Sequence, residues 1–280
     1  MRIFLTVILT AGFAFAQAPP APAKPAAAKP AASKAGAAKA GAAKTGAAAA
    51  PAPLGPTAAQ RVKLMSPASL KAVAPVEYKV KFTTLKDQSF VVDIHRDWAP
   101  HGADRFYNLV KNGFFTGVRF YRVAPGFVTQ FGLSPDPKIT MAWHAAQIPG
   151  DPVKEKNTKG RLTFAMGASP DSRTTQLFFN LADNSRLDPM GFAPIGEVIE
   201  NPEVVDGLFG GYGEIKEQGG GGPAQMNVAQ EGEKYLKANF DKLDTIKSAI
   251  VISPVPTAAP AKPAMKKTAP APKAAAPTKK

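Results

Sequence analysis

The sequence predicts a mainly β fold in which short antiparallel strands close, or nearly close, into a barrel. Strand-like runs with β-branched and aromatic residues recur through residues 76–253, and clusters of Pro, Gly, Asn and Asp separate them at regular intervals. Both ends of the chain have a different, Ala/Pro/Lys-rich composition. The folding part is therefore one domain, long enough to bury a hydrophobic core.

The first two strands should form a hairpin. The runs "EYKVKFTTL" (77–85) and "SFVVDIHRD" (89–97) both alternate apolar and polar residues, and three turn residues separate them. In "APHGADRFYNLVKNGFF" (99–115), apolar residues then recur at helical spacing until Gly113. We expect this helix to pack its apolar face on the sheet.

Further strand-like runs follow the helix, and two short helices precede the last strand. The expected strands are "VRFYRV" (118–123), "FVTQF" (127–131), "GRLTFAMG" (160–167), "TQLFFNLA" (175–182), "FAPIGEVI" (192–199) and "IKSAIVI" (246–252). The expected helices lie in 202–214 and 231–243. The glycine run 219–222 lacks the strand and the Lys-Ser/Thr of a phosphate-binding loop, so we expect a mobile surface loop.

The first 16 residues are predicted to be a secretory signal peptide. Arg2 precedes the apolar run "IFLTVILTAGFAFA", and the small-residue pattern 14–16 stands before Gln17. This run is too short to span a bilayer comfortably, and no other stretch approaches the ~20 apolar residues of a membrane helix. We expect cleavage near Ala16 and a periplasmic or secreted protein without a transmembrane segment. An uncleaved anchor is the alternative.

Residues 17–75 and 254–280 are predicted to be disordered tails, because they hold too few large apolar side chains to offset the entropy of ordering. Residues 1–75 and 254–280 together hold no acid, so the net charge of +14 belongs to them and residues 76–253 are close to neutral. A neutral domain argues against nucleic-acid binding. The tail lysines leave open a weak, salt-sensitive contact with an anionic cell wall or membrane surface, or a plain solvated spacer.

Hydrolytic and metal chemistry find little support in the sequence. The chain has no cysteine, and its histidines lack metal-ligand spacing. Ser169 in "GASPD" lacks the second glycine of a nucleophile elbow. We therefore expect no metal and no cofactor.

Three stretches of the sequence together match the pattern of a known protein family. "FYRVAPGFVTQFG" (120–132), "FAMGASPDSRTTQLFFN" (164–180) and "NSRLDPMGFAPIGEV" (184–198) follow the hairpin and helix in this order. Together they resemble the cyclophilin family of peptidyl-prolyl cis-trans isomerases, over essentially all of residues 76–253. The resemblance implies a closed eight-stranded antiparallel barrel capped by two helices. It also implies a monomeric isomerase that acts on proline-containing polypeptides, here during the folding of exported proteins.

The resemblance also assigns site residues. Arg122 matches the catalytic arginine, Gln130 matches the glutamine that holds it, and the remaining positions match the proline pocket and the groove for the substrate backbone. The predicted catalytic set is Arg122, Phe127 and Gln130, and the predicted substrate-binding set is Val128, Ala165, Met166, Gln176, Phe178, Leu187 and Phe192. Two alternatives stay open: a proline-peptide binding or chaperone module with little activity, and a structural wall-associated protein.

Three positions depart from the family pattern. Met166 stands where the groove has an asparagine, Arg186 where cyclosporin-sensitive members have a tryptophan, and Phe192 where a histidine borders the pocket. Loss of the indole ring and its N–H should weaken cyclosporin binding.

The turn at Pro125-Gly126 decides how the predicted site is assembled. A two-residue loop would pair Arg122 with Thr129 and turn Gln130 to the other side of the sheet. A three-residue loop that includes Phe127 pairs Arg122 with Gln130 instead. We predict the second register, because the glutamine can then orient the guanidinium.

Overall fold

The computed structural model describes residues 54–253. The predicted signal peptide (1–16), the tail 254–280 and most of the predicted linker lie outside these residues.

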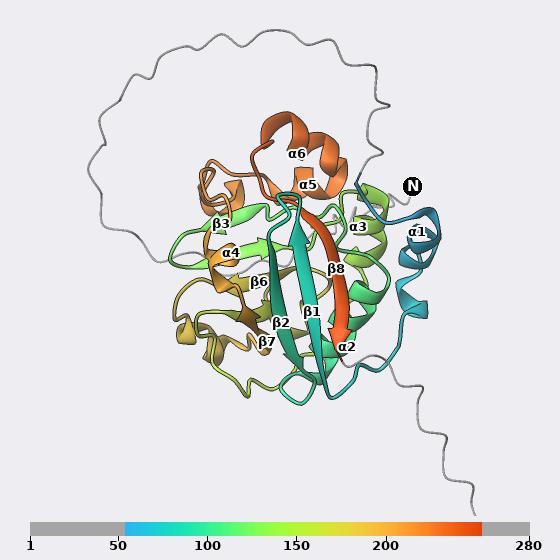
Figure 1. Cartoon of the computed structure of the whole chain (residues 1–280), viewed down its shortest axis with the longest axis vertical. Coiled ribbons are helices and arrows are strands. Elements are labelled where there is room, and N and C mark those ends of the chain that lie inside the picture. Colours follow the sequence, from blue (N-terminus) through green and yellow to red (C-terminus); the bar gives the residue numbers. More distant parts are fainter. Residues whose placement is uncertain (1–53, 254–280) are drawn as a thin grey trace, which may run out of the picture.

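Eight antiparallel strands form one strongly curled sheet, in the order β3-β4-β6-β5-β7-β2-β1-β8 (Figure 1). The mainly β prediction is confirmed. The strands are β1 (Glu77–Thr84), β2 (Ser89–His95), β3 (Arg122–Ala124), β4 (Val128–Phe131), β5 (Arg161–Phe164), β6 (Leu177–Asn180), β7 (Pro194–Glu200) and β8 (Ile246–Ser253).

The barrel is less closed than predicted. The two end strands, β3 and β8, do not form a ladder. The chain just before β3 meets the start of β8 at one isolated bridge between Arg119 and Thr245, beside a 3.0 Å hydrogen bond from Phe120 N to Asp244 O. The strand predicted at 118–123 is thereby reduced to Arg122–Ala124, because its first half makes an isolated bridge and single hydrogen bonds in place of a ladder.

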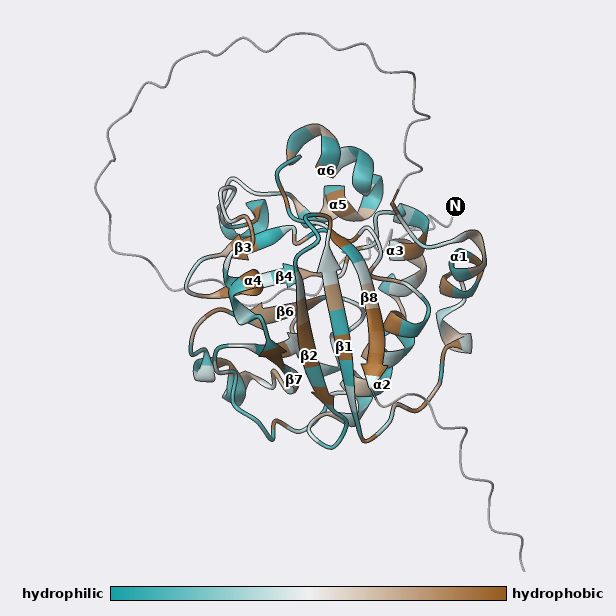
Figure 2. Ribbon diagram, viewed as in Figure 1, coloured by the Kyte–Doolittle hydropathy of each residue, from teal (hydrophilic) through white to brown (hydrophobic). Residues whose placement is uncertain are grey.

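The core lies inside the curled sheet and under helix α2 (Pro100–Lys111). Figure 2 shows apolar residues concentrated along the strands. Aromatic rings from strands that are not neighbours in the sheet meet there: the centroids of Phe90 and Phe179 lie 5.5 Å apart, and those of Phe82 and Phe131 lie 6.0 Å apart. Such pairs add to the burial of apolar area, so this cluster fixes how β1, β2, β4 and β6 curl around one another.

More helices surround the sheet than the two that the resemblance implies. The described residues also contain α1 (Ala58–Leu64), α3 (Pro137–His144), α4 (Pro202–Asp206), α5 (Gln225–Glu231) and α6 (Glu233–Asn239). Helix α3 was not predicted from the sequence, although Asp136 caps it and Pro137 begins it. Helices α5 and α6 lie together at one end of the sheet (Figure 1).

The predicted linker boundary at residue 75 is wrong for residues 57–75. Helix α1 begins with a capping box between Thr57 and Gln60, and Leu64 is fully buried. The indole N–H of Trp143 donates to the carbonyl of Leu64 at 2.9 Å. A buried leucine and the Trp143 indole therefore help to hold a segment whose average composition is that of a linker.

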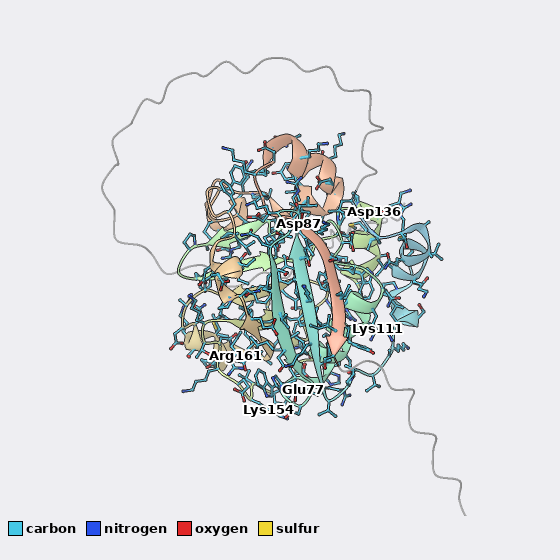
Figure 3. All side chains as sticks on the ribbon, in the orientation of Figure 1. Glu77, Asp87, Lys111, Asp136, Lys154 and Arg161 are labelled. Atoms are coloured by element: carbon cyan, nitrogen blue, oxygen red, sulfur yellow. The ribbon has the colours of Figure 1, made fainter. Side chains whose placement is uncertain are left out.

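Charged side chains such as Lys111 and Asp136 lie on the outside of the domain (Figure 3). Over residues 54–253, no helix has both the length and the apolar character needed to cross a bilayer.

Candidate active site

The β3–β4 hairpin confirms the predicted register. Arg122 pairs with Gln130, and Ala124 pairs with Val128, so residues 125–127 form the loop. The N–H of Phe127 donates to the carbonyl of Ala124 at 3.0 Å, and Gly126 has a φ of 75°. A three-residue loop with glycine in the left-handed region therefore puts the arginine and the glutamine on the same face.

A row of polar side chains leads away from Arg122 across the sheet. Arg122 Nη1 donates to Gln130 Oε1 at 3.0 Å, and Gln130 Nε2 donates to Gln176 Oε1 at 3.0 Å. The hydroxyl of Tyr121 donates to the same oxygen of Gln176. Burial raises the pKa of the Tyr121 phenol well above its ordinary value, so this hydroxyl stays protonated and remains a donor. The row fixes which end of each amide faces the arginine.

Glu214 holds the other side of Arg122, and the sequence did not predict it. Arg122 Nη2 lies 2.8 Å from Glu214 Oε2, and Arg122 Nε lies 3.1 and 3.2 Å from the two carboxylate oxygens. The Arg122 side chain is 0% exposed and the Glu214 side chain 21%. The two residues are 92 positions apart, and an acid in the turn-like run "GGYGE" gives no sequence signal of this contact.

The apolar residues of the predicted site come together in one buried cluster, which we call the proline pocket. Strands β3, β4 and β6, the residues just after β5 and the short helix η3 (Ser185–Met190) contribute to it, and the rings of Phe178 and Phe192 meet at a centroid distance of 5.9 Å. The cluster consists of Ala124, Phe127, Val128, Ala165, Met166, Phe178, Leu187 and Phe192. Phe192 thus lies in the pocket, as predicted from its place in the sequence.

Buried amides support the pocket from beneath. Asn184 Nδ2 donates to the carbonyl of Phe127 and to Asn180 Oδ1, both at 2.9 Å. Asn157 Nδ2 donates to the carbonyl of Phe192 at 2.8 Å. Sequence reasoning missed these asparagines, because asparagine in a loop ordinarily indicates a turn. Here they fix the backbone of two pocket residues.

Two guanidinium groups lie over the ring of Phe127. The Cζ atom of Arg122 is 5.5 Å from the ring centroid, and that of Arg186 is 4.7 Å from it. Arg186 is an exposed residue on η3. The position where cyclosporin-sensitive members have a tryptophan therefore carries a cation stacked on the ring of Phe127.

All ten predicted site residues lie together in the structure. The chemistry that they offer is a hydrogen-bond donor held next to a buried cluster of aromatic and aliphatic side chains. Within residues 54–253, no group of three or more His, Asp or Glu side chains could hold a metal ion. Their geometry fits the predicted isomerase chemistry, and their individual roles stay predictions.

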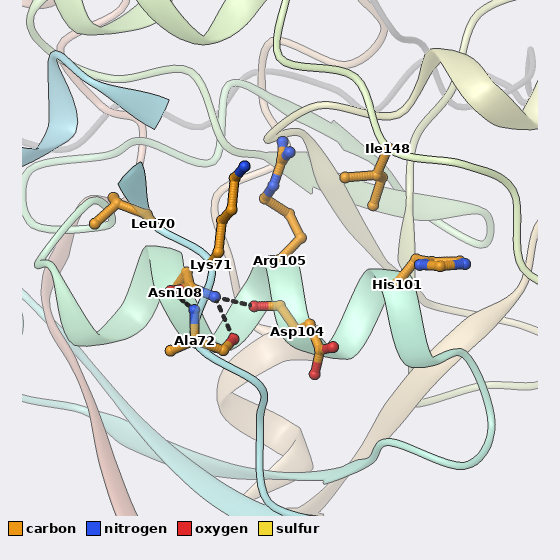
Figure 4. A pocket seen from close by; sticks show the side chains of 8 residues that line it. All are labelled: Leu70, Lys71, Ala72, His101, Asp104, Arg105, Asn108 and Ile148. Atoms are coloured by element: carbon orange, nitrogen blue, oxygen red, sulfur yellow. Dashed lines mark hydrogen bonds between the residues drawn. The ribbon is translucent and has the colours of Figure 1, made fainter. Parts of the chain in front are cut away.

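A separate hollow of about 240 Å³ lies between α2 and the segment before β1 (Figure 4). Its polar side chains serve the fold. Asn108 Nδ2 donates to the carbonyl of Ala72 at 2.7 Å, and Asp104 Oδ1 accepts from Ala74 N at 2.8 Å. These contacts tie the 70–74 segment to α2.

Comparison with known proteins agrees with the geometry. A family model described as "Cyclophilin type peptidyl-prolyl cis-trans isomerase/CLD" matches residues 79–225, more than half of the chain. A peptidyl-prolyl cis-trans isomerase of Acinetobacter baylyi is 35% identical over 128 residues, which are 41% of this chain and 63% of that protein. The chain thus spans less than two thirds of that relative.

Two further proteins are similar to the chain. Peptidyl-prolyl cis-trans isomerase B of Escherichia coli is 30% identical over 134 residues, which are 43% of this chain and 77% of that protein. A solved cyclophilin type isomerase of Cryptosporidium parvum has a TM-score of 0.46 and 16% identity, covering 64% of this chain and 99% of that one.

Proposed function

Because the chain belongs to the cyclophilin-type peptidyl-prolyl cis-trans isomerase family, we propose that it catalyses the cis-trans isomerisation of Xaa-Pro peptide bonds, with Arg122 as the catalytic donor. The observation that carries the proposal is the position of Arg122 directly beside the proline pocket, over the ring of Phe127.

The reaction needs no bond to be made or broken. Rotation about a peptide bond meets a barrier of ~18–20 kcal/mol, because amide resonance is lost in the twisted state. The prolyl nitrogen then regains its lone pair and can accept a hydrogen bond. A donor that meets this nitrogen binds the transition state better than either planar form, and this difference raises the rate.

The proposed roles follow from the contacts. The proline pocket holds the pyrrolidine ring, which is apolar and fits among Phe127, Phe178 and Leu187. Arg122 donates toward the prolyl nitrogen. Gln130 fixes the direction of the guanidinium through its bond to Nη1. Burial makes the donor stronger than it would be in water.

Ala165, Met166 and Gln176 are proposed to line the groove for the substrate backbone. Met166 has no side-chain amide, so any polar contact at this position comes from its backbone. Gln176 Oε1 already accepts from Gln130 and Tyr121, which leaves its amide nitrogen to face a peptide. Arg186 in place of an indole predicts weak cyclosporin binding.

We also propose that the protein acts outside the cytoplasm, on proteins that fold after export. The support is the N-terminal sequence, with one basic residue, an apolar run and an Ala-Phe-Ala pattern before Gln17. The Lys-rich tails are proposed to attract it weakly to anionic wall or membrane surfaces, and the domain to work as a monomer.

The test is a protease-coupled assay of Xaa-Pro isomerisation with the full-length chain. We expect acceleration by the wild type and a loss of about 100-fold or more in kcat/KM for Arg122→Ala. Peptide binding without any acceleration by the wild type would support the alternative, a proline-peptide binding module.

A further inference from the structure

We propose that Glu214 is a positioning residue for the isomerase reaction: its carboxylate fixes the plane and direction of the Arg122 guanidinium. The inference rests on the proposed function, because it concerns the same arginine. It starts from the three Arg122–Glu214 contacts of 2.8 to 3.2 Å, which come from a segment far from the hairpin in the sequence.

Glu214 and Gln130 bind different atoms of the Arg122 guanidinium. Glu214 accepts from Nε and Nη2, and Gln130 accepts from Nη1. Gln130 alone would leave the planar group free to swivel about a single hydrogen bond. A carboxylate that bridges Nε and Nη2 removes that freedom, because the fork of the guanidinium matches the two oxygens. Donation to a prolyl nitrogen then comes from a guanidinium whose plane and direction are fixed.

Charge gives a second reason for this pairing. The Arg122 side chain is fully buried, and a buried cation is stable only with a hydrogen-bonded counter-charge. Gln130 and Gln176 are neutral, so Glu214 supplies the negative charge that faces the guanidinium. Its charge stabilises the buried arginine in the site.

The segment 209–223, which we call the glycine-rich segment, holds Glu214 in place from both sides. Ile215 is fully buried in a cluster that includes Tyr121, Leu133 and side chains of α5 and α6. On the other side, Gly222 N donates to the carbonyl of Glu214 at 2.8 Å, and Gly220 N donates to that of Ile215 at 3.0 Å.

The glycine run 219–222 has a clear steric purpose in this arrangement. A Cβ on Gly220 would lie 2.0 Å from the carbonyl oxygen of Glu214, and one on Gly222 would lie 2.7 Å from it. Only glycine lets the loop close this tightly on the backbone of Glu214. The run therefore shapes the support for the arginine's partner.

The direct test compares Glu214→Gln with the wild type in full-length protein. Glutamine keeps the size of the side chain and removes the charge and the second acceptor oxygen. We expect kcat to fall roughly tenfold while KM changes less than about twofold, because the change disturbs the direction of a donor used in the transition state. Unchanged or higher kcat would overturn the inference, since Glu214 would then be dispensable or would restrain the arginine.

A double-mutant cycle separates positioning from a structural effect. In the Arg122→Ala background, Glu214→Gln should change the residual rate by less than about twofold, because its target is gone. An equal tenfold loss in that background would overturn the inference. Glu233→Gln is the matched control, since Glu233 forms a comparable pair with Arg119 through Nη2 at 2.5 Å on nearby α6, away from the pocket. It should stay within about twofold of the wild type.

An NMR measurement tests the Arg122–Glu214 contact independently of turnover. The NMR signal of the Arg122 Nε–H should be displaced and protected from exchange in the wild type and in Glu233→Gln. Glu214→Gln and Gly220→Ala should both lose this signature, the second by displacing the Glu214 backbone. A signal that keeps its position in both variants would overturn the contact itself.

The two proposals fail differently. An inactive wild-type chain would overturn the proposed function and this inference together. An active wild type beside a fully active Glu214→Gln would overturn only the role of Glu214.

Discussion

The proline pocket and the glycine-rich segment make the two halves of one site by different means. The pocket is built from strands that already hold the core, and its residues lie in three sequence stretches with strong patterns. The glycine-rich segment follows β7 in the sequence, and its Glu214 side chain contacts the guanidinium of Arg122. Glu214 from this segment and Gln130 from β4 hold Arg122, and we call these three polar side chains the polar half. A mutation in the pocket should therefore cost mainly fold stability, and one in the polar half mainly rate.

The largest effect on stability should come from the pocket. Phe178 is fully buried and contacts Phe192, so Phe178→Ala removes an aromatic ring and leaves a cavity. We expect the free energy of unfolding to fall by about 3–5 kcal/mol, as judged by denaturant titration. KM for proline peptides should also rise. A loss below about 1 kcal/mol would show that the pocket is not part of the core and would end the contrast drawn above.

The polar half should respond in the opposite way to Gln130→Leu. Leucine has a similar size, but it cannot accept from Arg122 Nη1 or donate to Gln176. We expect kcat/KM to fall by about 10- to 100-fold, which is about 1.4–2.7 kcal/mol of transition-state stabilisation. Steady-state kinetics with a tetrapeptide would measure it. Full activity would show that Arg122 needs no partner on this side.

Asn184 lies between the two halves, because it is polar but supports the pocket. Asn184→Ala removes the amide group that donates to the carbonyl of Phe127 and to Asn180 Oδ1. We expect a loss of about 1–2 kcal/mol in stability, measured by thermal unfolding. The rate should fall by less than for Gln130→Leu. A larger rate loss than for Gln130→Leu would mean that the position of Phe127 limits catalysis more than the direction of Arg122 does.

The smallest effect should come from Asp93 on β2, outside both halves. Its Oδ1 atom is buried without a hydrogen-bond partner in the described part of the chain, and burial, reinforced by the charge of Glu77, raises its pKa. An acid with a raised pKa in the folded state contributes stability below its unfolded pKa and loses it as the pH rises through the folded pKa. Asp93→Asn should therefore raise the Tm at pH 7, by roughly 2 °C.

This gain in Tm should shrink as the pH falls and vanish near about pH 3, where the aspartate is protonated in both states. Thermal unfolding of both proteins at the two pH values would measure it. Isomerase activity should not change. A gain that is the same at both pH values would show that ionisation of Asp93 is not its cause.

Local patterns were enough to predict most of the sheet and the pocket. The alternation in 77–85 and 89–97 reports a half-buried hairpin, and the turn at 125–127 fixes the register that joins Arg122 to Gln130. These features depend on neighbours along the chain, which the sequence displays directly.

What the sequence could not predict depends on single contacts between distant segments. Helix α1 is held by Leu64 and Trp143, and Arg122 is held by Glu214. Neither contact changes composition or periodicity. The average character of residues 57–75 therefore indicated a linker, and Glu214 fell at the glycine-rich end of a predicted short helix with no sign of its contact. The closure of the barrel was overstated, because β3 and β8 form no ladder, and the segment before β3 meets the start of β8 through an isolated bridge and a few backbone hydrogen bonds.

The most direct test of the central claim is NMR exchange spectroscopy of a proline peptide with a small amount of full-length protein, wild type beside Arg122→Ala. The wild type should produce exchange peaks between the cis and trans signals of the peptide, which isomerises over tens to hundreds of seconds when left alone. With Arg122→Ala, the peptide signals should still shift on binding, but the exchange peaks should disappear. Exchange peaks of equal strength with the variant would contradict the account, because the pocket alone would then suffice for catalysis.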